Sequence, residues 1–467
     1  MKRSPVKPLV ILLASMAMGA QAADLKDVAN AAWSYDGTWQ AARQNWEASQ
    51  QTLVQGRAML LPTIDAKYGH YRNDRHLEDS GSTIKYDDEV TSVTLTQPLF
   101  RLDAFYGYKE AKASVSVDRA NFYQARQAFV LRVANGYFGV LRAWDNLVSA
   151  QAEEKAIGRQ LEQTKERFKV GLVPGTDVQE AQASYDLTKV NLIVAKQDFS
   201  IARDQLEAFT GRKWNDLAEL RKNLPMGNPQ PDDMSAWLDK ASYQNPDIMA
   251  ARYTAKEAGF TAKRQLGAML PKVQLVGSYS HEHVAPDGSI PAAALDNLNP
   301  DGHGTQVGIE VTMPLFHGGS LNSQRKQALL RSQAADNTFQ QTLRNVTQET
   351  RSSYRTVEAD SLRVKARRQA IRSAESALEA TRSGYQVGTR NIVDVLNAEQ
   401  ALYAAQRDYA NARYDYILDS LTLKGSAGEL DIADLVDINT WLSDQQGLNL
   451  YNPDLEGQSD AIMAKEN

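Results

Sequence analysis

Residues 385–397, YQVGTRNIVDVLN, decide the fold of this chain, because a second version of the stretch stands 217 residues earlier. At that offset FKVG of residues 168–171 corresponds to YQVG of residues 385–388, and TDV of residues 176–178 corresponds to VDV of residues 393–395. A repeat of this length in a chain of 467 residues indicates one duplication, not an array of short units. We therefore expect each half to contain the same elements in the same order.

Each half contains one very long stretch of helical composition. Residues 104–170 and 321–387 each run for 67 residues without proline and are rich in Ala, Gln, Arg and Glu. At about 1.5 Å per residue, such a helix approaches roughly 100 Å, so the architecture is elongated. Steps of three and four residues from Val178 and from Val395 select mostly apolar side chains, with Asp419 among the second set. This spacing is typical of a coiled-coil seam in both halves.

A glycine follows each long stretch directly. Gly171 and Gly388 stand where glycine commonly ends a helix, since it adopts a left-handed backbone without steric cost. The two glycines turn the chain back into the seam helices. We therefore expect both turns at one far end of the molecule.

Two short stretches per half predict strands. VTLTQPLF of residues 93–100 matches IEVTMPLF of residues 309–316, and residues 64–68, 273–278 and 307–313 alternate between apolar and polar side chains. Alternation over about 10 residues is typical of an outer membrane barrel, although any half-buried sheet produces it. About eight strands are needed to close a barrel, and open edges cannot lie in lipid. If these strands are in a membrane, several chains must share one barrel.

The N-terminus has the three parts of a cleaved secretory signal. Lys2, Arg3 and Lys7 precede an apolar run over residues 9–20, and Ala20-Gln21-Ala22 supplies the small residues that a signal peptidase reads. The run is too short to span a bilayer. We expect export of the chain, with residues 1–22 removed.

Composition excludes several classes of protein. The chain has no Cys, a net charge of −5 and a mean hydropathy of −0.48. These values argue against thiol chemistry, a nucleic-acid binder and a bundle of membrane-spanning helices. No nucleotide-binding, metalloprotease or nucleophile motif is present, so we expect no enzyme, no catalytic residue and no cofactor. His281-Glu282-His283 could bind a surface metal, but solvated side chains are the better interpretation because no metal-site spacing is evident.

The doubled turn motif resembles that of a known family. Residues 385–397 and the corresponding VGLVPGTDV of residues 170–178 closely resemble the periplasmic tip motif of the TolC family of outer membrane exit ducts. The resemblance covers nearly the whole chain after residue 22. It implies an α+β membrane protein that forms a homotrimer. Four strands from each chain build a 12-stranded outer membrane β-barrel, which continues into a long periplasmic coiled-coil α-barrel with a small mixed equatorial domain.

This interpretation sets the domain boundaries. The expected segments are a signal peptide (1–22), a helical segment (23–62), two barrel strands with an outer loop (63–100), a long helix with tip turn and seam helix (101–211), an equatorial linker (212–234), and the second-half counterparts (235–271, 272–316 and 317–427) followed by an equatorial tail (428–467).

The resemblance assigns the tip to a protein contact. It implies that Gly171, Leu172, Gly388 and Thr389 meet a periplasmic adaptor, which is compatible with both glycines being helix caps. The adaptor would recruit an inner-membrane pump of the ABC or the proton-driven type, since this chain encodes no energy source. Outer membrane lipid is a further expected partner.

Four other positions match the family's gate. Tyr385, Arg390, Thr176 and Asp177 correspond to residues that hold the inner coiled coils closed. We name Arg390 and Asp177 as the first pair, because a guanidinium opposite a carboxylate is geometrically selective. The alternative is an ordinary exposed ion pair of about 0–1 kcal/mol.

A carboxylate ring is the last site that the resemblance implies. Asp394 lies one turn into the second seam helix, and the family's matching Asp points into the lumen, so a trimer gives three carboxylates. The family often has a second Asp one turn later, where this chain has Asn397. We expect weaker cation selectivity, and weaker block by trivalent cations, than in a relative with two rings.

The sequence leaves two main functions to compare. The leading one is a gated passive exit channel for proteins, small toxic compounds or both, handed over by inner-membrane pumps. The alternative is a periplasmic coiled-coil adaptor without a pore, although adaptors usually lack doubled strand pairs.

Overall fold

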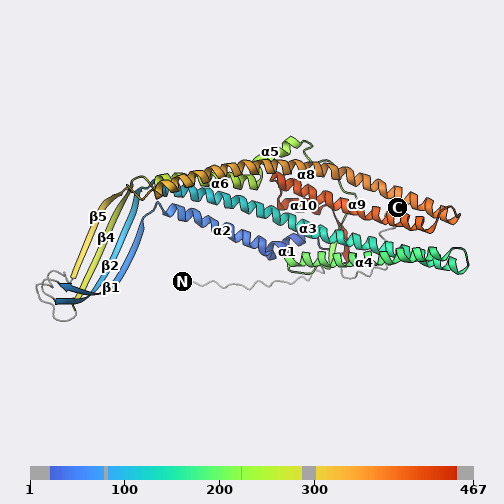
Figure 1. The fold of residues 1–467 in the computed structure, drawn as a ribbon, viewed down its shortest axis with the longest axis horizontal. Coiled ribbons are helices and arrows are strands. Elements are labelled where there is room, and N and C mark those ends of the chain that lie inside the picture. Colours follow the sequence, from blue (N-terminus) through green and yellow to red (C-terminus); the bar gives the residue numbers. More distant parts are fainter. Residues whose placement is uncertain (1–21, 78–81, 222, 287–300, 450–467) are drawn as a thin grey trace, which may run out of the picture.

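The molecule is elongated, with its sheet and its helix turns at opposite ends (Figure 1). The computed structural model describes residues 22–77, 82–221, 223–286 and 301–449 of the 467-residue chain. The predicted signal peptide, apart from Ala22, lies outside the described residues, as does the end of the predicted equatorial tail. Short elements lie midway along the long helices.

The order of elements repeats once, which confirms the predicted duplication. The corresponding pairs are α1 (Leu25–Tyr35) with α5 (Met234–Gln244), α2 (Gly37–Ala58) with α6 (Pro246–Gly267), β1 (Thr63–Leu77) with β4 (Lys272–Pro286), β2 (Ser82–Phe100) with β5 (Asp301–Thr312), α3 (Leu102–Lys169) with α8 (Ser320–Gln386), and α4 (Gly175–Thr210) with α9 (Ile392–Ala427). The longest helices differ by one residue, 68 in α3 against 67 in α8, and α4 and α9 both have 36.

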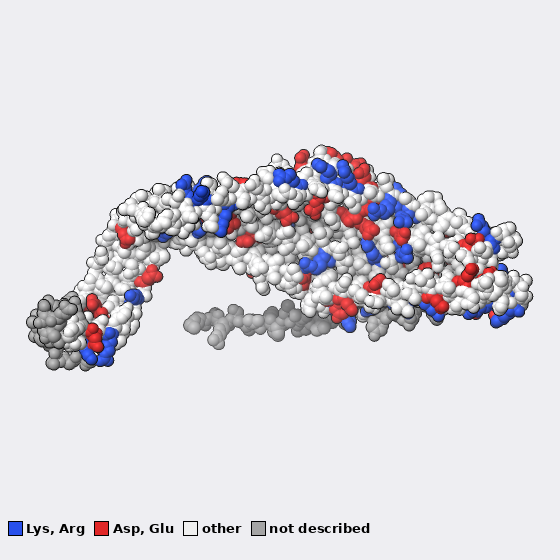
Figure 2. All heavy atoms as spheres, viewed as in Figure 1, with Lys and Arg blue, Asp and Glu red and all other residues white. Residues whose placement is uncertain are grey.

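The four strands form one antiparallel sheet in the order β1-β2-β4-β5. The two halves meet at its centre, where Val93 of β2 lies opposite Tyr279 of β4. Apolar side chains are exposed on the sheet, namely Ile64, Tyr68, Val93, Tyr279, Val307, Ile309 and Val311. Charged side chains are sparser on the sheet next to the helices than over the helical body (Figure 2). The sheet therefore presents apolar surface that nothing in the described part of the chain covers.

The long helices pair into two hairpins. α3 packs against α4, α8 packs against α9, and α3 also packs along α9, which joins the hairpins. The observed ends lie within about two residues of the predicted stretches, because the proline-free sequence continues until a glycine stops it. No helix in the described part of the chain is both long and apolar enough to cross a membrane.

Near the middle of the molecule, a layer made of a two-stranded sheet and a short helix joins the two halves. β3 (Asp216–Leu220) pairs antiparallel with β6 (Leu442–Asn449), and α10 (Ile432–Asn439) precedes β6. The largest cluster of buried apolar side chains lies here and includes Trp144 and Tyr137, both fully buried. The Tyr137 hydroxyl donates a 2.7 Å hydrogen bond to the Ala218 carbonyl oxygen. The two hairpins extend from this layer toward their tips.

Candidate functional site at the hairpin tips

The first hairpin turns through a left-handed glycine. α3 ends at Lys169, and Gly171 has φ +75°. The Gly171 N–H donates to the Phe168 carbonyl oxygen and the Leu172 N–H donates to the Arg167 carbonyl oxygen, both at 2.9 Å. This pair of bonds satisfies the last carbonyls of the helix. Leu172 is 73% exposed, so the turn presents an apolar side chain at the end of the molecule.

The second hairpin turns in the same way but is held by more bonds. Gly388 has φ +80° and its N–H donates to the Tyr385 carbonyl oxygen at 3.2 Å. The Gly384 carbonyl oxygen accepts from the Thr389 N–H at 2.9 Å, from the Arg390 N–H at 3.3 Å and from the Thr389 hydroxyl at 3.1 Å. The second turn is therefore the more constrained of the two.

The helices that follow the turns begin differently. α9 begins with a capping box, in which the Asp394 N–H donates to Asn391 Oδ1 at 2.8 Å and the Asn391 N–H donates to Asp394 Oδ2 at 3.3 Å. α4 begins after Pro174, which has no polar side-chain atom, so this helix start has no side-chain cap. The Asp394 carboxylate, predicted for the lumen ring, is thus engaged by its own helix end and is about one-third exposed.

The predicted ion pair between Arg390 and Asp177 does not form within one chain. Arg390 Nη1 lies 3.8 Å from Asp394 Oδ2, one turn along the same segment. No ion pair joins Arg390 to Asp177 among the described residues. Asp177 is half-buried at the start of α4 and Thr176 is exposed beside it. Asp394, in the first turn of α9, is the local partner of Arg390, which lies in the turn just before that helix.

Tyr385 does join the two hairpins, but through contacts that the sequence did not predict. Its ring lies under the guanidinium of Arg167 from α3, with 4.9 Å between Cζ and the ring centroid. Its hydroxyl is buried and has no hydrogen-bond partner among the described residues. The ring packs against a small cluster of five buried side chains, Ile157, Leu161, Ala181, Ile392 and Leu396. These apolar contacts hold the hairpins together near the tips.

A buried acid, missed by the sequence analysis, lies behind Tyr385. Glu399 of α9 is 2% exposed, and Arg382 of α8 donates to its Oε1 at 2.7 Å. Burial raises the pKa of the Glu399 carboxyl, and the cations Arg382 and Arg159 oppose that rise. The signal for this residue was an acid on the apolar face of α9, between Leu396 and Leu402. Its partner, 17 residues earlier, could not be assigned without the hairpin.

A polar cavity of about 450 Å³ lies between the hairpins at this level. Its lining includes Arg159, Gln163 and Arg167 from α3 and Arg382 from α8, with Glu399 among the α9 residues. α3 and α8 are therefore separated here by a hydrophilic space instead of a close-packed seam.

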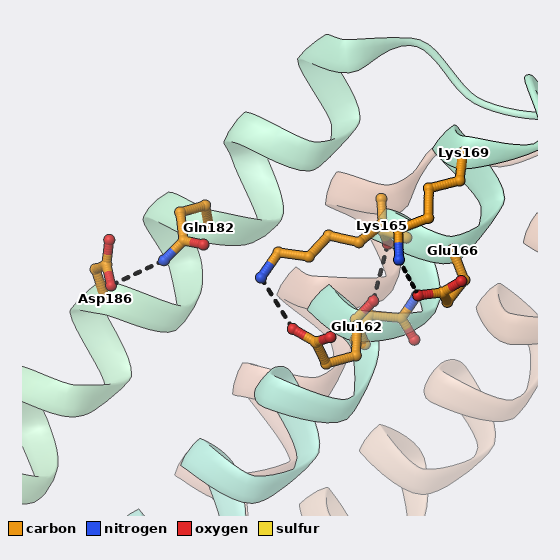
Figure 3. A network of polar contacts seen from close by, with 8 residues as sticks. Glu162, Lys165, Glu166, Lys169, Gln182 and Asp186 are labelled. Carbon is orange, nitrogen blue, oxygen red and sulfur yellow. Dashed lines mark hydrogen bonds and ion pairs between the residues drawn. The ribbon is translucent and has the colours of Figure 1, made fainter.

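The matching positions of the first hairpin form only local, exposed contacts. Lys165 and Gln182 are the counterparts of Arg382 and Glu399 at the 217-residue offset. Lys165 Nζ lies 2.9 Å from Glu162 on its own helix, and Gln182 donates to Asp186 at 3.1 Å (Figure 3). Both contacts stay within one helix, so neither joins α3 to α4. Exposed pairs of this kind contribute little to stability.

The two positions of the predicted lumen ring lie one turn apart on α9. Asp394 is partly exposed and Asn397 is exposed. A single chain presents both side chains to open space and does not by itself define a lumen.

The histidine segment shows no metal centre. In the described ranges, no group of three or more His, Asp or Glu side chains is arranged to hold a metal ion. His283 Nδ1 instead lies 2.7 Å from Asp301 Oδ1 across the strands β4 and β5.

Comparisons with known proteins agree with this geometry. The sequence matches the family described as outer membrane efflux protein over residues 36–212 and 237–429. It is 32% identical to the outer membrane protein TolC of Vibrio cholerae serotype O1 over 444 residues, covering 94% of this chain and 99% of that protein. It is 29% identical over 424 residues to the alkaline protease secretion protein AprF of Pseudomonas aeruginosa, covering 89% and 86%.

The fold matches a solved channel as well. The structure resembles the CmeC outer membrane channel of Campylobacter jejuni with a TM-score of 0.73 at 18% identity, covering 94% of this chain and 97% of that one. The two blocks of the family match fall on the two halves of the duplication. The predicted family resemblance and fold class are thereby confirmed.

Proposed function

The chain belongs to the outer membrane efflux protein family and forms an exit channel of the outer membrane, and we propose that it does so as a homotrimer. Each chain gives four strands to a shared 12-stranded barrel in the outer membrane. The helices continue as a hollow cylinder through the periplasm, with the tips facing the inner membrane. Substrates pass through without a catalytic step.

One observation carries the proposal, namely the four-stranded sheet with two open edges. β1 and β5 each pair on one side only among the described residues, and the sheet exposes apolar side chains. Four strands cannot close, and unpaired backbone groups have no partner in lipid. Three copies satisfy both requirements at once, because 12 strands close into a barrel without edges.

The flanks of the helical body support the same assembly. α4 exposes Leu187, Val190, Val194 and Ile201, each at least 44% exposed. Their spacing of 3, 4 and 7 residues is that of a coiled-coil seam. This seam has no partner helix within the described chain, and α8 on the opposite flank has only nine buried residues against 20 in α3. We assign the free seam of α4 to the neighbouring subunit.

The tips support a gate and a docking surface. Gly171, Leu172, Gly388 and Thr389 are all exposed at the ends of the hairpins, and we propose that they contact a periplasmic adaptor. That adaptor would connect the channel to an ABC or proton-driven pump in the inner membrane. We propose proteins as one class of cargo because of the secretion relative. We propose small toxic compounds as a second class because of the efflux family.

The gate itself is proposed to close between subunits. Asp177 and Thr176 begin the helix α4, whose free seam faces the next chain in this assembly, and Arg390 stands at the start of α9. The Arg390–Asp177 pair that one chain does not form is thus assigned to the subunit boundary. Tyr385 holds the two hairpins of one chain together, and three copies of Asp394 form the lumen ring.

The adaptor without a pore is the weaker candidate. It explains the coiled coils but not the paired strands of both halves, which the family match includes. We propose that the sheet lies in the outer membrane and the helices lie in the periplasm. Residues 1–22 would direct export and then be cleaved off after Ala22. The domain boundaries predicted from the sequence stand as proposals on the same basis.

Conductance of the purified full-length protein in a planar bilayer tests this function. We expect small unitary conductance that increases severalfold in the double variant Tyr385→Phe with Arg390→Ser, because the links between hairpins and between subunits are lost. Phe168→Tyr is the matched control, since Phe168 is the first-half counterpart of Tyr385 and is half-exposed. Unchanged conductance in the double variant would refute the gate, and absence of any channel would refute the pore.

A further inference from the structure

The polar cavity between the hairpins has more positive than negative charge in its lining. Three guanidinium groups line it, those of Arg159, Arg167 and Arg382, against the single carboxylate of Glu399. Arg382 is paired with Glu399 at 2.7 Å. Arg159 and Arg167 form no ion pair with an acid among the described residues. Two guanidinium charges in the lining are therefore without a counterion, which suits the cavity to an anion.

The acids on the same stretch of α3 do not neutralise these two cations. Glu162 pairs with Lys165 at 2.9 Å and Glu166 pairs with Lys169 at 2.6 Å, each within the same helix (Figure 3). Neither acid is part of the cavity lining. The lining itself thus supplies no counterion for Arg159 and Arg167.

Two buried polar atoms of the lining residues also lack partners. Glu399 is 2% exposed, and its Oε2 receives no hydrogen bond from the described residues, although Arg382 donates to its Oε1. The Tyr385 hydroxyl is buried and has no partner there either. A buried polar group without a partner is destabilising. A ligand that completes this set accepts hydrogen bonds from Tyr385 and the arginines and donates one to Glu399.

Inorganic phosphate has this combination of groups. Its ionised oxygens accept the forked N–H groups of arginine, and at neutral pH it keeps a P–OH that donates a hydrogen bond. Sulfate has a similar shape but no proton to donate, so it would place an oxyanion against the Glu399 carboxylate. A phosphate monoester loses its last proton at about pH 6, and a phosphodiester has none, so both lack the donor at pH 7.5.

The duplication shows that the fold does not require these side chains. None of the five polar residues recurs as the same residue in the other half, and only one recurs with its charge. The counterparts of Arg159, Arg167, Arg382, Tyr385 and Glu399 at the 217-residue offset are Ser376, Gly384, Lys165, Phe168 and Gln182. Both hairpins nevertheless pair their helices, and both seam helices have 36 residues. The set therefore serves something other than the frame that the halves share.

We propose that the cavity between the hairpins is a binding site for inorganic phosphate. Arg159 and Arg167 of α3 and Arg382 of α8 donate to its ionised oxygens. Tyr385 donates its hydroxyl, and the P–OH donates to Glu399 Oε2. The ligand thus contacts both hairpins, removes the repulsion between the guanidinium groups of α3 and α8, and holds the two helices together near the tips. Its effect on the channel rests on the proposed gate, whereas the binding itself does not.

Isothermal titration calorimetry of the full-length protein in detergent tests the site. At pH 7.5 and constant ionic strength, we expect sodium phosphate to bind at least about tenfold more tightly than sodium sulfate or glycerol 3-phosphate, because only phosphate donates to Glu399. Equal binding of phosphate and sulfate, or no saturable binding of phosphate, would overturn the proposal. Tighter binding of glycerol 3-phosphate would overturn the choice of inorganic phosphate in favour of an ester.

Three variants locate the site. Arg159→Gln removes one guanidinium and should weaken phosphate binding about tenfold. Lys165→Gln makes the same change of charge on α3 outside the cavity lining and should leave binding unchanged. Glu399→Gln puts an amide N–H donor in place of Oε2, so sulfate should then bind at least as tightly as phosphate. A preference for phosphate that persists in Glu399→Gln would refute the contact with Glu399. If that variant does not fold, equal binding in Arg159→Gln and Lys165→Gln still refutes the site.

Amide hydrogen exchange measures whether the ligand joins the hairpins. Saturating phosphate should slow the exchange of residues 159–167 and 382–390 severalfold relative to the same protein in sulfate, because the ligand contacts both segments. Arg159→Gln at the same phosphate concentration should show a smaller effect, and Lys165→Gln the full effect. Calorimetric binding without any change in exchange would refute the bridge between the hairpins.

Discussion

The two halves of this molecule have the same frame and different chemistry. Both hairpins end at a left-handed glycine with matching backbone bonds, and their seam helices have equal lengths. Near the tip, the first half has Lys165 and Gln182, whose contacts stay within one helix. At the matching positions the second half has Arg382 and Glu399, and this ion pair joins α8 to α9. The duplicated residues specify the fold, and the residues that differ specify how each hairpin is held.

The halves also differ in how much of each helix a single chain buries. α9 has 14 buried residues and α4 only five, although both have 36 residues. Central packing in the chain therefore belongs to α3 and α9, while α4 and α8 form the flanks. The two halves have the same elements but bury them to different extents. In the proposed trimer, the exposed faces of α4 and α8 are covered by neighbouring subunits.

The largest expected effect comes from placing a charge on the free seam of the first half. Val194→Asp puts a carboxylate in the proposed boundary between subunits, where burial without a partner costs several kcal/mol. We expect the trimer to dissociate, as measured by native mass spectrometry or light scattering in detergent. The single chain should keep its helical content, because Val194 is half-exposed within it.

Ser200→Asp, six residues further along α4, adds the same charge away from the seam and is the control. It should leave the trimer intact, since Ser200 is exposed and is not on the 3- and 4-residue series of the seam. A trimer that survives Val194→Asp would move the subunit boundary away from α4.

A smaller effect is expected at the buried acid of the second half. Arg382→Ala leaves Glu399 buried without its donor and should lower the free energy of unfolding by about 1–3 kcal/mol, discounted because Arg382 itself is half-exposed. Glu399→Gln should cost less, because burial already raises the pKa of this carboxyl and the amide carries no charge. The stability lost in Arg382→Ala should be smaller at low pH, because protonation of Glu399 removes the uncompensated charge. Denaturant unfolding at pH 5 and pH 8 measures both.

Lys165→Ala, the same change in the first half, is the matched control. Its pair with Glu162 is exposed and lies within one helix, so the expected loss is below about 0.5 kcal/mol. Equal losses in the two variants would show that both hairpins are held in the same way.

Local patterns predicted the long helices, the turns and the strands. Residues 104–170 and 321–387 were bounded correctly because proline is absent within them and a glycine stops each one. The alternation along residues 307–313 likewise identified a strand from neighbouring side chains alone. These features depend on contacts between residues close in sequence, which a single sequence displays.

Contacts across the hairpins were not predictable in the same way. Arg390 was assigned to Asp177, but in one chain it lies beside Asp394, because the i,i+4 partner is nearer than any residue of the other hairpin. Arg382 and Glu399 meet only because α8 and α9 fold back with one particular register. The seam of α4 predicted from Val178 packs within the chain, where Ala181 and Phe199 are buried. The second apolar face of α4, which a single chain leaves exposed, was not identified from the sequence.

The smallest expected effect concerns the charge near the entrance of the pore. At the 217-residue offset, Asp394 and Asn397 correspond to Asp177 and Glu180, so the first half has two acids where the second has one. Asn397→Asp makes the second half like the first and doubles the proposed lumen ring from three carboxylates to six. Each added charge at about 4 Å contributes roughly 1 kcal/mol even in water, so block by a trivalent cation should need severalfold less cation. Glu180→Gln removes an exposed acid of the first half and should leave block unchanged if only the α9 positions face the lumen. Single-channel recordings decide between the halves, because equal block in Asn397→Asp and the unaltered protein would mean that α9 does not carry the ring.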